Sequence, residues 1–517
     1  METTRARPAG RPRLAPLAHC LAIALTLGIG QASAADSRHP ALTGSPIPGF
    51  DASLFAAPSR RWQPSPDAAS QIHRPYPHTP VHRPEVTILI DNCDDDGPGS
   101  LRQVANEVAQ SGDTIDFSQL TCSTITLTSG EIIFTQDDIT LVGPDDGSVI
   151  IDGDGVASLR HTGSGTFELD NIVMIDGAKY LDDTINLNAM GGCVYSAGFV
   201  SMSNSYLKYC HARTTNTAYR AEGGAIFAAN GVTLSNSEVF LSEAGSSTDT
   251  GVGGGIFSGD SVAIVDSSVS LNKSDGAGGV AAIGGLVAKY STFSGNYSYG
   301  VAGGLYVAGN TIIQNSTIDG NGAAAVGGGA FLVGAGATTP LSFSNSTVSG
   351  NTAPAIGGVF ITGYAAQFGS STVAFNVETG PTKYGAGVYS GADVTFESTI
   401  VGANSIDSGG TLVPDDVGGA DTAVFLGHDN LVTFVVGTPA MPADTLYEDP
   451  QLAALANNGG LTRTHMLLPN SPAIDTGNNE VGSAADQRGS GFPRVIGASA
   501  DIGAVEFSDV IFANGFD

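Results

Sequence analysis

Side chains that could catalyse a reaction are sparse along most of this chain of 517 residues. Elimination from a polysaccharide needs a cationic base beside carboxylates, and hydrolysis needs paired carboxylates. From Ala221 to Gly427 there is no histidine or arginine, and the lysines are Lys273, Lys289 and Lys383. The acidic residues of this stretch recur at unequal spacings, for example Asp260, Asp266, Asp319 and Glu397. We therefore predict no catalytic residues.

One group of charged residues lies earlier in the chain. It consists of Asp182, Asp183, Arg213, Arg220 and Glu222. These residues could form a site, but exposed ion pairs are common on protein surfaces and contribute little free energy. We interpret them as a charged surface loop.

A repeated aromatic residue is the more promising feature for binding. It directly follows an aliphatic residue in each of seven similar segments, as Tyr195, Phe227, Phe257, Tyr306, Phe331, Phe360 and Tyr389. Because side chains alternate along a strand, aromatics next to inward residues point outward. A stacked outward column could bind sugar rings or a partner protein, or it could stabilise the fold by cross-strand stacking. Val287 is expected to interrupt it.

One acidic turn could bind a metal ion. Residues 92–97, Asn-Cys-Asp-Asp-Asp-Gly, place oxygen-bearing side chains before a glycine, as a calcium loop does. The closing carboxylate is missing, because Gln103 stands at its position. An acidic turn before a helix is the alternative, and Asp152-Gly153-Asp154-Gly155 is similarly ambiguous. We predict no metal and no cofactor, with calcium as the alternative.

The elements that must position these residues repeat every 25–30 residues or so, which indicates a solenoid. Glycine pairs precede the aromatic segments, and runs such as Ser316-Thr317-Ile318-Asp319-Gly320-Asn321 lie between them. The runs are short, rich in β-branched residues and broken by glycine, so we predict strands. Equivalent strands pair about 4.8 Å apart, so equivalent residues stack. Inward aliphatic residues should form one column: Val194, Ile226, Ile256, Leu305, Ala330, Val359 and Val388. Asparagines such as Asn296, Asn321, Asn351 and Asn376 should form a ladder.

This pattern resembles that of the right-handed parallel β-helix proteins of the pectin-lyase-like class, over about half of the chain. The resemblance implies an all-β fold: a right-handed parallel β-helix solenoid with a short N-terminal helical cap and a C-terminal β-rich cap module. Lyases, hydrolases, adhesins and phage tailspikes share this architecture, so the fold alone does not define a function.

The N-terminal region falls into three parts. Basic residues, an apolar run and Ala32-Ser33-Ala34 make residues 1–34 a signal peptide, so we predict export. Residues 35–84 are rich in proline and lack apolar periodicity, which indicates a disordered linker. Residues 85–122 resemble the N-terminal module named after Cys-Ser-Leu-Arg-Glu-Ala, through Ser100-Leu101-Arg102 and the following Asp-Thr-Ile-x-Phe. Ser100 is the expected helix cap.

Four cysteines remain after removal of the signal peptide. They form two local pairs, Cys93 with Cys122 and Cys193 with Cys210. An even number in an oxidising compartment predicts two disulfides, each contributing about 3 kcal/mol. Free buried thiols are the alternative.

The parallel β-helix is expected over residues 123–405 and a different module over residues 406–507. Five segments of that module, among them Asn470-Ser471-Pro472-Ala473-Ile474-Asp475 and Asp486-Gln487-Arg488-Gly489, resemble the choice-of-anchor Q module of bacterial surface β-helix proteins. Its polar residues His465, Asp475, Asp486, Arg488, Asp501 and Glu506 could form a site. We favour an ion pair of Arg488 within a folded cap that ends the helix. Residues 508–517 form a C-terminal tag.

Charge restricts the partners. The chain carries 50 acidic and 21 basic residues, a formal net charge of −29, which argues against nucleic acid and anionic membranes. No segment after the signal peptide is long and apolar enough to span a membrane. We predict a secreted, monomeric protein at the bacterial cell surface, with an adhesin-like role or a polysaccharide or host-surface partner. Whether it is an enzyme stays open, with a polysaccharide lyase or glycoside hydrolase as the alternative function.

Overall fold

A computed structural model describes residues 86–246, 250–334, 340–437, 439–480 and 482–508. The described residues all belong to one compact unit. The predicted signal peptide, the linker and most of the C-terminal tag lie outside the described residues. Among the described residues, no helix combines the length and the apolar character needed to cross a membrane.

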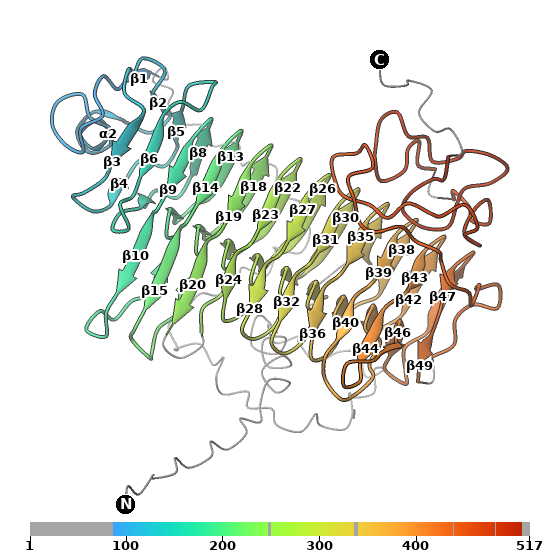
Figure 1. Ribbon diagram of the computed structural model, residues 1–517. Helices are drawn as coiled ribbons and strands as arrows, with labels where there is room; N and C mark the ends of the chain where they lie inside the picture. Colours follow the sequence, from blue (N-terminus) through green and yellow to red (C-terminus); the bar gives the residue numbers. More distant parts are fainter. Residues whose placement is uncertain (1–85, 247–249, 335–339, 438, 481, 509–517) are drawn as a thin grey trace, which may run out of the picture. The chain divides into compact units, whose positions relative to one another are not determined.

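The described strands stack into four long sheets, which wind around one core (Figure 1). Each turn of the chain contributes one strand to sheets C, A, B and, in most turns, D. Pairing is parallel throughout these sheets except between β44 (Ser405–Asp407) and β45 (Leu412–Pro414). This architecture confirms the predicted all-β parallel β-helix.

Sheets C and A carry the first two sides of each turn. Sheet C contains β4 (Ile132–Phe134), β7 (Leu159–His161), β12 (Val194–Ser196), β17 (Ile226–Ala228), β21 (Ile256–Ser258), β25 (Val280–Ala282), β29 (Leu305–Ala308), β33 (Ala330–Val333), β37 (Val359–Thr362), β41 (Val388–Ser390), β46 (Val417–Gly419) and β49 (Val435–Val436). Sheet A contains β1 (Thr87–Leu89), β2 (Asp113–Asp116), β5 (Ile139–Val142), β8 (Thr166–Asp170), β13 (Phe199–Ser203), β18 (Gly231–Ser235), β22 (Ser261–Val265), β26 (Gly285–Lys289), β30 (Asn310–Gln314), β34 (Leu341–Ser344), β38 (Ala366–Gly369), β42 (Val394–Glu397) and β47 (Phe425–His428).

Sheets B and D carry the other two sides. Sheet B contains β3 (Thr124–Thr126), β6 (Ile150–Asp152), β9 (Val173–Ile175), β14 (Tyr206–Lys208), β19 (Glu238–Phe240), β23 (Ser268–Ser270), β27 (Thr292–Ser294), β31 (Thr317–Asp319), β35 (Thr347–Ser349), β39 (Thr372–Ala374), β43 (Ile400–Gly402) and β48 (Leu431–Val432). Sheet D contains β10 (Ala178–Leu181), β15 (His211–Thr214), β20 (Glu243–Ser246), β24 (Lys273–Ser274), β28 (Tyr297–Ser298), β32 (Gly322–Ala323), β36 (Thr352–Ala353), β40 (Val377–Glu378), β44 (Ser405–Asp407) and β45 (Leu412–Pro414). A separate pair joins β11 (Ala189–Met190) and β16 (Ala221–Glu222).

The predicted inward column of sheet C is confirmed. Register pairing joins its members from Val194 to Val388 and adds Val280 between Ile256 and Leu305. All of these side chains are fully buried. Phenylalanines stack in the core from sheet A, with 4.6 Å between the ring centroids of Phe343 and Phe368.

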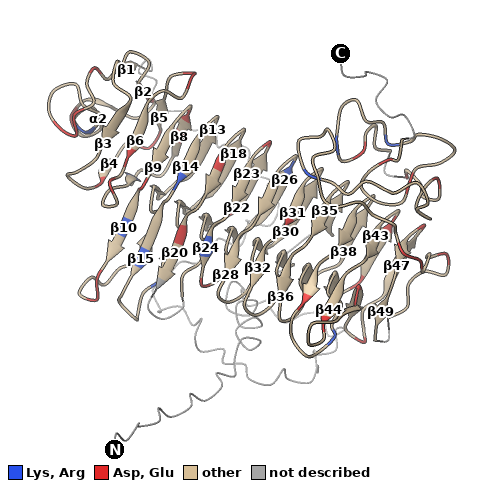
Figure 2. Ribbon diagram, viewed as in Figure 1, with Lys and Arg blue, Asp and Glu red and all other residues tan. Residues whose placement is uncertain are grey.

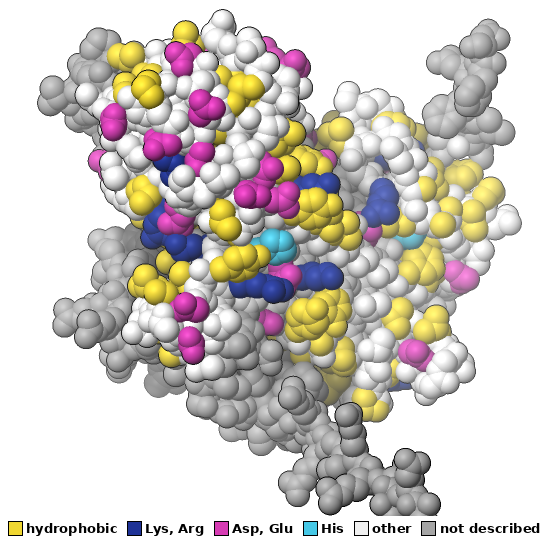
Figure 3. Space-filling view, turned by 60° about the vertical axis from the view of Figure 1, so that its left-hand side comes forward, with side chains coloured by type: hydrophobic (Ala, Val, Ile, Leu, Met, Phe, Trp, Pro, Cys, Tyr) yellow, Lys and Arg dark blue, Asp and Glu magenta, His cyan; other side chains and the backbone are white. Residues whose placement is uncertain are grey.

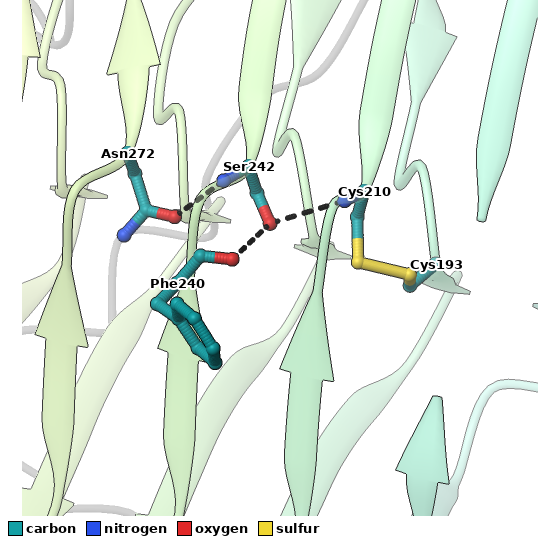
Figure 4. Close-up of a disulfide and its surroundings, with 5 residues drawn as sticks. All are labelled: Cys193, Cys210, Phe240, Ser242 and Asn272. Atoms are coloured by element: carbon teal, nitrogen blue, oxygen red, sulfur yellow. Dashed lines mark hydrogen bonds between the residues drawn. A yellow bond between two sulfur atoms is a disulfide. The ribbon is translucent and has the colours of Figure 1, made fainter. Parts of the chain in front are cut away.

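The predicted asparagine ladder is also confirmed, at the bend between sheets B and D. The side-chain amide of each asparagine donates to the Oδ1 of the next, from Asn272 through Asn296, Asn321, Asn351 and Asn376 to Asn404. The backbone N–H of Cys210 donates to Ser242 Oγ, and the N–H of Ser242 donates to Asn272 Oδ1, so the Cys193–Cys210 disulfide lies at the start of the ladder (Figure 4). Asp416 ends the ladder, because its Oδ1 accepts the backbone N–H and the side-chain amide of Asn404.

The N-terminal cap is as short as predicted. A turn of α-helix, α2 (Leu101–Gln103), continues into a π-helical turn, η3 (Val104–Val108). Ser100 caps it through its hydroxyl, which accepts the N–H of Gln103, and Leu101 is buried against the first coils. The predicted Cys93–Cys122 and Cys193–Cys210 disulfides are both present.

The C-terminal module differs from the expected end cap in two ways. Strands of the β-helix continue to β49, past the expected boundary at residue 406. Beyond them the described residues form loops joined by isolated bridges, such as Ala456 with Thr464, instead of continuous strands. Figure 1 shows this module standing beside β35 and β38, on the flank of the coils. It lies there because Asn315, Thr347 and other polar residues on the coils bond its backbone and side chains.

Candidate functional site

The predicted aromatic column exists on the outer face of sheet C. Register pairing aligns its members from Tyr195 to Tyr389. Ala281 stands between Phe257 and Tyr306, whereas Val287, which was expected to interrupt the column, lies in β26 of sheet A. The error arose because Ala281, which follows the inward Val280, has no ring, so this segment does not match the repeated aromatic pattern.

The rings of this column cover one another. Tyr195, Phe227 and Phe257 are stacked nearly parallel, with centroids 5.3 and 5.4 Å apart. The Arg160 guanidinium lies 3.9 Å from the Tyr195 ring centroid, and Tyr306 and Phe331 are only 2% and 0% exposed. Cross-strand stacking of this kind stabilises a sheet. A binding role for the column stays a prediction.

A second surface combines charge with exposed rings. It lies on the outer faces of sheets B and D, and we call it the B–D patch: Tyr180, Lys208, Tyr209, His211, Arg213, Glu243, Lys273, Tyr297 and Tyr299, with Asp152 and Asp176 at its edge. Figure 2 shows basic residues on β10, β14, β15 and β24 and acidic ones on β20. Figure 3 shows charged, histidine and hydrophobic side chains mixed on the face that carries the N-terminal coils.

The register explains this gathering. His211, Glu243, Lys273 and Tyr297 pair in sequence across β15, β20, β24 and β28. The residue after each of these four is buried, namely Ala212, Ala244, Ser274 and Ser298. Because side chains alternate along a strand, the four therefore point outward. Arg213 bonds Glu243 across neighbouring strands, with 2.6 Å between its NH2 nitrogen and Oε1. Neighbouring coils therefore place alternating charges side by side.

The tyrosines of the patch expose large ring surfaces. Tyr180, Tyr209, Tyr297 and Tyr299 are 54%, 39%, 37% and 59% exposed. Tyr297 and Tyr299 meet edge to face, with centroids 5.1 Å apart. Lys208 Nζ lies 4.4 Å from the Tyr209 ring centroid, which holds its charge beside that ring. Tyr209 has a positive φ of 57°, at the bend between β14 and β15.

A small acid–base group borders the tyrosines. Burial and the Asp152 carboxylate raise the pKa of Asp176, while the charges of His211 and Lys208 oppose the shift. Burial also lowers the pKa of His211, so the ring is neutral at pH 7. Among the described residues, His211 Nδ1 has no hydrogen-bond partner. A carboxyl group, a neutral imidazole and an ammonium group in one place are the components of proton transfer.

The charged residues that the sequence predicted to share one surface loop have different partners in the structure. Arg213 belongs to the B–D patch and bonds Glu243. Glu222 instead accepts a bond from the Asn188 side chain, beside β16. Asp182 accepts the backbone N–H of Thr184 in a turn after β10. The expected surface-loop role fits Asp182, but Arg213 lies among residues that the sequence did not single out.

The acidic turn at residues 92–97 is bound by an arginine. Asp95 Oδ1 lies 2.6 Å from an Arg102 guanidinium nitrogen, and its Oδ2 accepts bonds from Thr128 and Ser129. Although partial burial acts to raise it, these bonds lower the pKa of Asp95 to about 2. Arg102 also donates to the carbonyl of Glu131, so the turn fixes the cap helix to the first coils.

The polar residues of the C-terminal module form ion pairs inside it. Arg488 bonds Asp486, as favoured from the sequence, with 2.6 Å between NH2 and Oδ2. The fully buried Arg494 and Glu506 form a second pair at 2.7 Å. His465 Nδ1 donates to Ala453 O, and Nε2 of the neutral ring accepts from the Ser349 hydroxyl, so this side chain lies between the module and sheet B. These contacts are structural.

The module also bounds the open part of sheet B. Outward residues of β31, β35 and β39, such as Thr317, Thr347 and Thr372, are buried under it. Their register equivalents Thr292 and Ser268 are partly exposed. Arg463 marks the edge, bonding Asp319 and Ser294. The B–D patch therefore lies on the uncovered coils beside this edge.

The group of Asp176, Lys208 and His211 was missed in the sequence because Asp176 comes from one coil and the other two from the next, and the coils differ in length. A signal did exist: Asp176-Gly177-Ala178 and Tyr209-Cys210-His211 each follow a short strand and bend into the next. Both Asp176 and Tyr209 adopt positive φ, so these two triplets are equivalent positions of successive coils.

Comparisons with known proteins give a limited result. No protein-family model matches the sequence, and no curated protein matches it. Among solved structures, the crystal structure of pectate lyase Pel9A is similar, with a TM-score of 0.35 and 12% identity over 82% of this chain and 97% of that chain. Neither value supports an inference about activity.

Proposed function

We propose that this protein binds an anionic polysaccharide through the B–D patch. The observation that carries the proposal is the alternation of exposed tyrosines with Lys208, Arg213 and Lys273, which form a local group of cations on an otherwise acidic chain. Tyrosine rings offer flat apolar faces with a polar end, and cations pair with the carboxylates or sulfates of an acidic sugar chain.

The arrangement also favours an extended ligand. Lys208 and Arg213 come from one coil and Lys273 from the coil two turns further on, and successive strands are separated by about 4.8 Å along the axis. A polymer lying along the axis would meet a charge or ring at each coil, whereas a small ligand would meet one or two. Glu243 pairs with Arg213 and limits non-specific attraction of anions.

The test is binding of the full chain to polygalacturonate and to a neutral glucan, by isothermal titration calorimetry. We expect binding to polygalacturonate alone, weakened at least 10-fold by Tyr297→Ala and by Lys273→Gln and decreasing as salt rises. Tyr447→Ala is the control, because Tyr447 is an exposed ring in the C-terminal module, at 58% against 37% for Tyr297. Equal affinity for both polymers, or equal loss in the control, contradicts the proposal.

A second candidate function is eliminative cleavage of the bound polymer. The specific observation is the raised pKa of Asp176 beside His211 and Lys208. Neutral His211 would remove the proton next to a sugar carboxylate, and the C–O bond to the leaving sugar would break as the double bond forms. Unsaturated products absorb in the ultraviolet, so purified protein should generate that absorbance from polygalacturonate, and Asp176→Asn and His211→Ala should abolish it. If binding occurs with no absorbance, the protein is a binder.

We also infer that the protein acts outside the cell, as a monomer at the bacterial surface with an adhesin-like role. The two disulfides support an oxidising compartment. The signal peptide, the module named after Cys-Ser-Leu-Arg-Glu-Ala and the choice-of-anchor Q module remain proposals supported by sequence motifs. Cell fractionation of the source organism with an antibody against the protein tests this placement.

A further inference from the structure

A group of metal-ligating side chains lies where the last coils meet the C-terminal module. Glu397 in β42 and His428 in β47 are register partners on adjacent strands of sheet A. Glu480 reaches them from a loop of the module. One ligand atom from each of these three residues lies within 4.8 Å of the other two. Three separate parts of the chain thus converge on one point.

The histidine is oriented for coordination. His428 Nδ1 lies 2.9 Å from Asp429 Oδ2, and Asn478 Nδ2 donates to the same carboxylate oxygen at 2.8 Å. This contact favours a proton on Nδ1, so that Nε2, 3.4 Å from Glu480 Oε2, can offer its lone pair to an ion that displaces any proton there. A carboxylate behind the imidazole is the arrangement that fixes metal-binding histidines in proteins.

The loop that carries Glu480 is fixed to the coils. Ser398, the residue after Glu397, accepts the backbone N–H of Asn478 at 2.6 Å and donates to its carbonyl at 3.1 Å. The N–H of Glu480 in turn donates to Asn478 Oδ1. Glu480 is therefore held beside Glu397 by contacts that do not involve either carboxylate.

We propose that Glu397, His428 and Glu480 bind a divalent transition-metal ion of the zinc class. One imidazole nitrogen with two carboxylate oxygens is a donor set that zinc accepts, with water at a fourth position. Ligands at about 2.0–2.2 Å in a tetrahedron lie roughly 3.5 Å apart, which a small rotation of the exposed Glu480 achieves. The bound ion would join the module to the last coils.

A neighbouring set, His428 with Asp429 and Asp444, offers an alternative position for the ion. It would use Nδ1, which Asp429 already occupies, and Asp444 accepts the backbone N–H of Asp429. On the Nε2 side the carboxylates are those of Glu397 and Glu480, and Nε2 is not occupied by Asp429. The geometry therefore points to the Nε2 side.

The test is zinc binding to the full chain, measured by competition with a chromogenic chelator beside calcium and magnesium. We expect Glu480→Gln and Glu397→Gln to weaken one equivalent of zinc at least 10-fold, and His428→Gln to remove it. Asp444→Asn should leave it unchanged, and Asp429→Asn, which alters only the positioning of His428, should weaken it 10–100-fold. Histidines before residue 86 are present in every variant, so the differences isolate this site.

A second readout is thermal. Zinc should raise the unfolding midpoint of the wild-type chain and not that of Glu480→Gln, whose exposed side chain can change without loss of folding. The proposal is overturned if no equivalent of zinc depends on Glu397, His428 and Glu480, or if calcium binds more tightly than zinc. It is also overturned if Asp444→Asn matches the loss in Glu480→Gln, because the ion would then lie at Nδ1.

Discussion

The asparagine ladder gives the sharpest test of how the coils are held together. Asn321 is fully buried and makes four side-chain hydrogen bonds. Its Oδ1 accepts the backbone N–H and the side-chain amide of Asn296, at 2.9 and 3.0 Å. Its Nδ2 donates to Phe293 O and to Asn351 Oδ1, both at 2.9 Å. Asn321→Ala removes all four bonds without changing the backbone.

The expected loss follows from these bonds. Each contributes about 1 kcal/mol net, and a buried donor left without a partner costs a further ~1–3 kcal/mol. The stranded donors are the backbone N–H of Asn296 and one N–H of its side-chain amide, while the other amide N–H keeps its bond to Val269 O. Four bonds at about 1 kcal/mol each and the cost of the stranded donors together lower the expected free energy of unfolding of Asn321→Ala by at least about 5 kcal/mol.

The measurement is urea-induced unfolding of wild type and variant, followed by circular dichroism. Ser270→Ala is the control, since Ser270 lies partly exposed on the outer face of sheet B and should change the free energy by less than about 0.5 kcal/mol. A loss in Asn321→Ala no larger than in this control would refute the reasoning, because it would mean that the ladder contributes no net stability.

Three further predictions concern other buried groups. Burial and the neighbouring Asp415 raise the pKa of Glu378 to about 9, so stability present below about pH 4.5 should be lost as pH rises through 9. Glu378→Gln should remove at least about 1.4 kcal/mol of this dependence in denaturation at pH 5 and pH 9. Gln487→Leu should free the module for limited proteolysis, because Gln487 bonds both Thr317 and Thr347. Replacing Cys193 and Cys210 with serine should cost about 3 kcal/mol in urea unfolding, since their disulfide closes a loop with a separation of 17 residues.

Each of these predictions has a contradicting result. A pH dependence unchanged in Glu378→Gln would assign it to other carboxyl groups, such as Asp416, whose pKa burial raises to about 7. Proteolysis of the module at the wild-type rate in Gln487→Leu would mean that other contacts suffice. Equal stability of the reduced wild type and the double serine variant is expected, and a difference between them would show an effect beyond the disulfide.

The coil interior was predictable because each turn repeats the same physical demand. A glycine pair, an inward aliphatic residue and an asparagine recur, and parallel pairing stacks them, so the column around Ile256 and the ladder through Asn321 follow from spacing. Cysteine positions predicted both disulfides for a similar local reason. Coils of unequal length weakened this logic, which is why Ala281 was not recognised as a member of the aromatic column.

The surface was less predictable, because outward residues come from register and not from a motif. Lys273 is far in sequence from Lys208 and His211, and its proximity to them depends on the lengths of the coils between them. The flank position of the C-terminal module was also not visible, because polar residues such as Asn315 and Gln487 read as ordinary turn residues until their partners are known.

The ladder has a consequence for how such a protein could change in length. Every rung donates in the same direction, from Asn272 toward Asp416, and each asparagine offers the same acceptor to the coil before it. Excising the 24 residues that separate Asn272 from Asn296 would let Asn272 donate to Asn321 in place of the missing rung. Whole coils are thus interchangeable units, and gain or loss of a coil leaves the remaining joints intact.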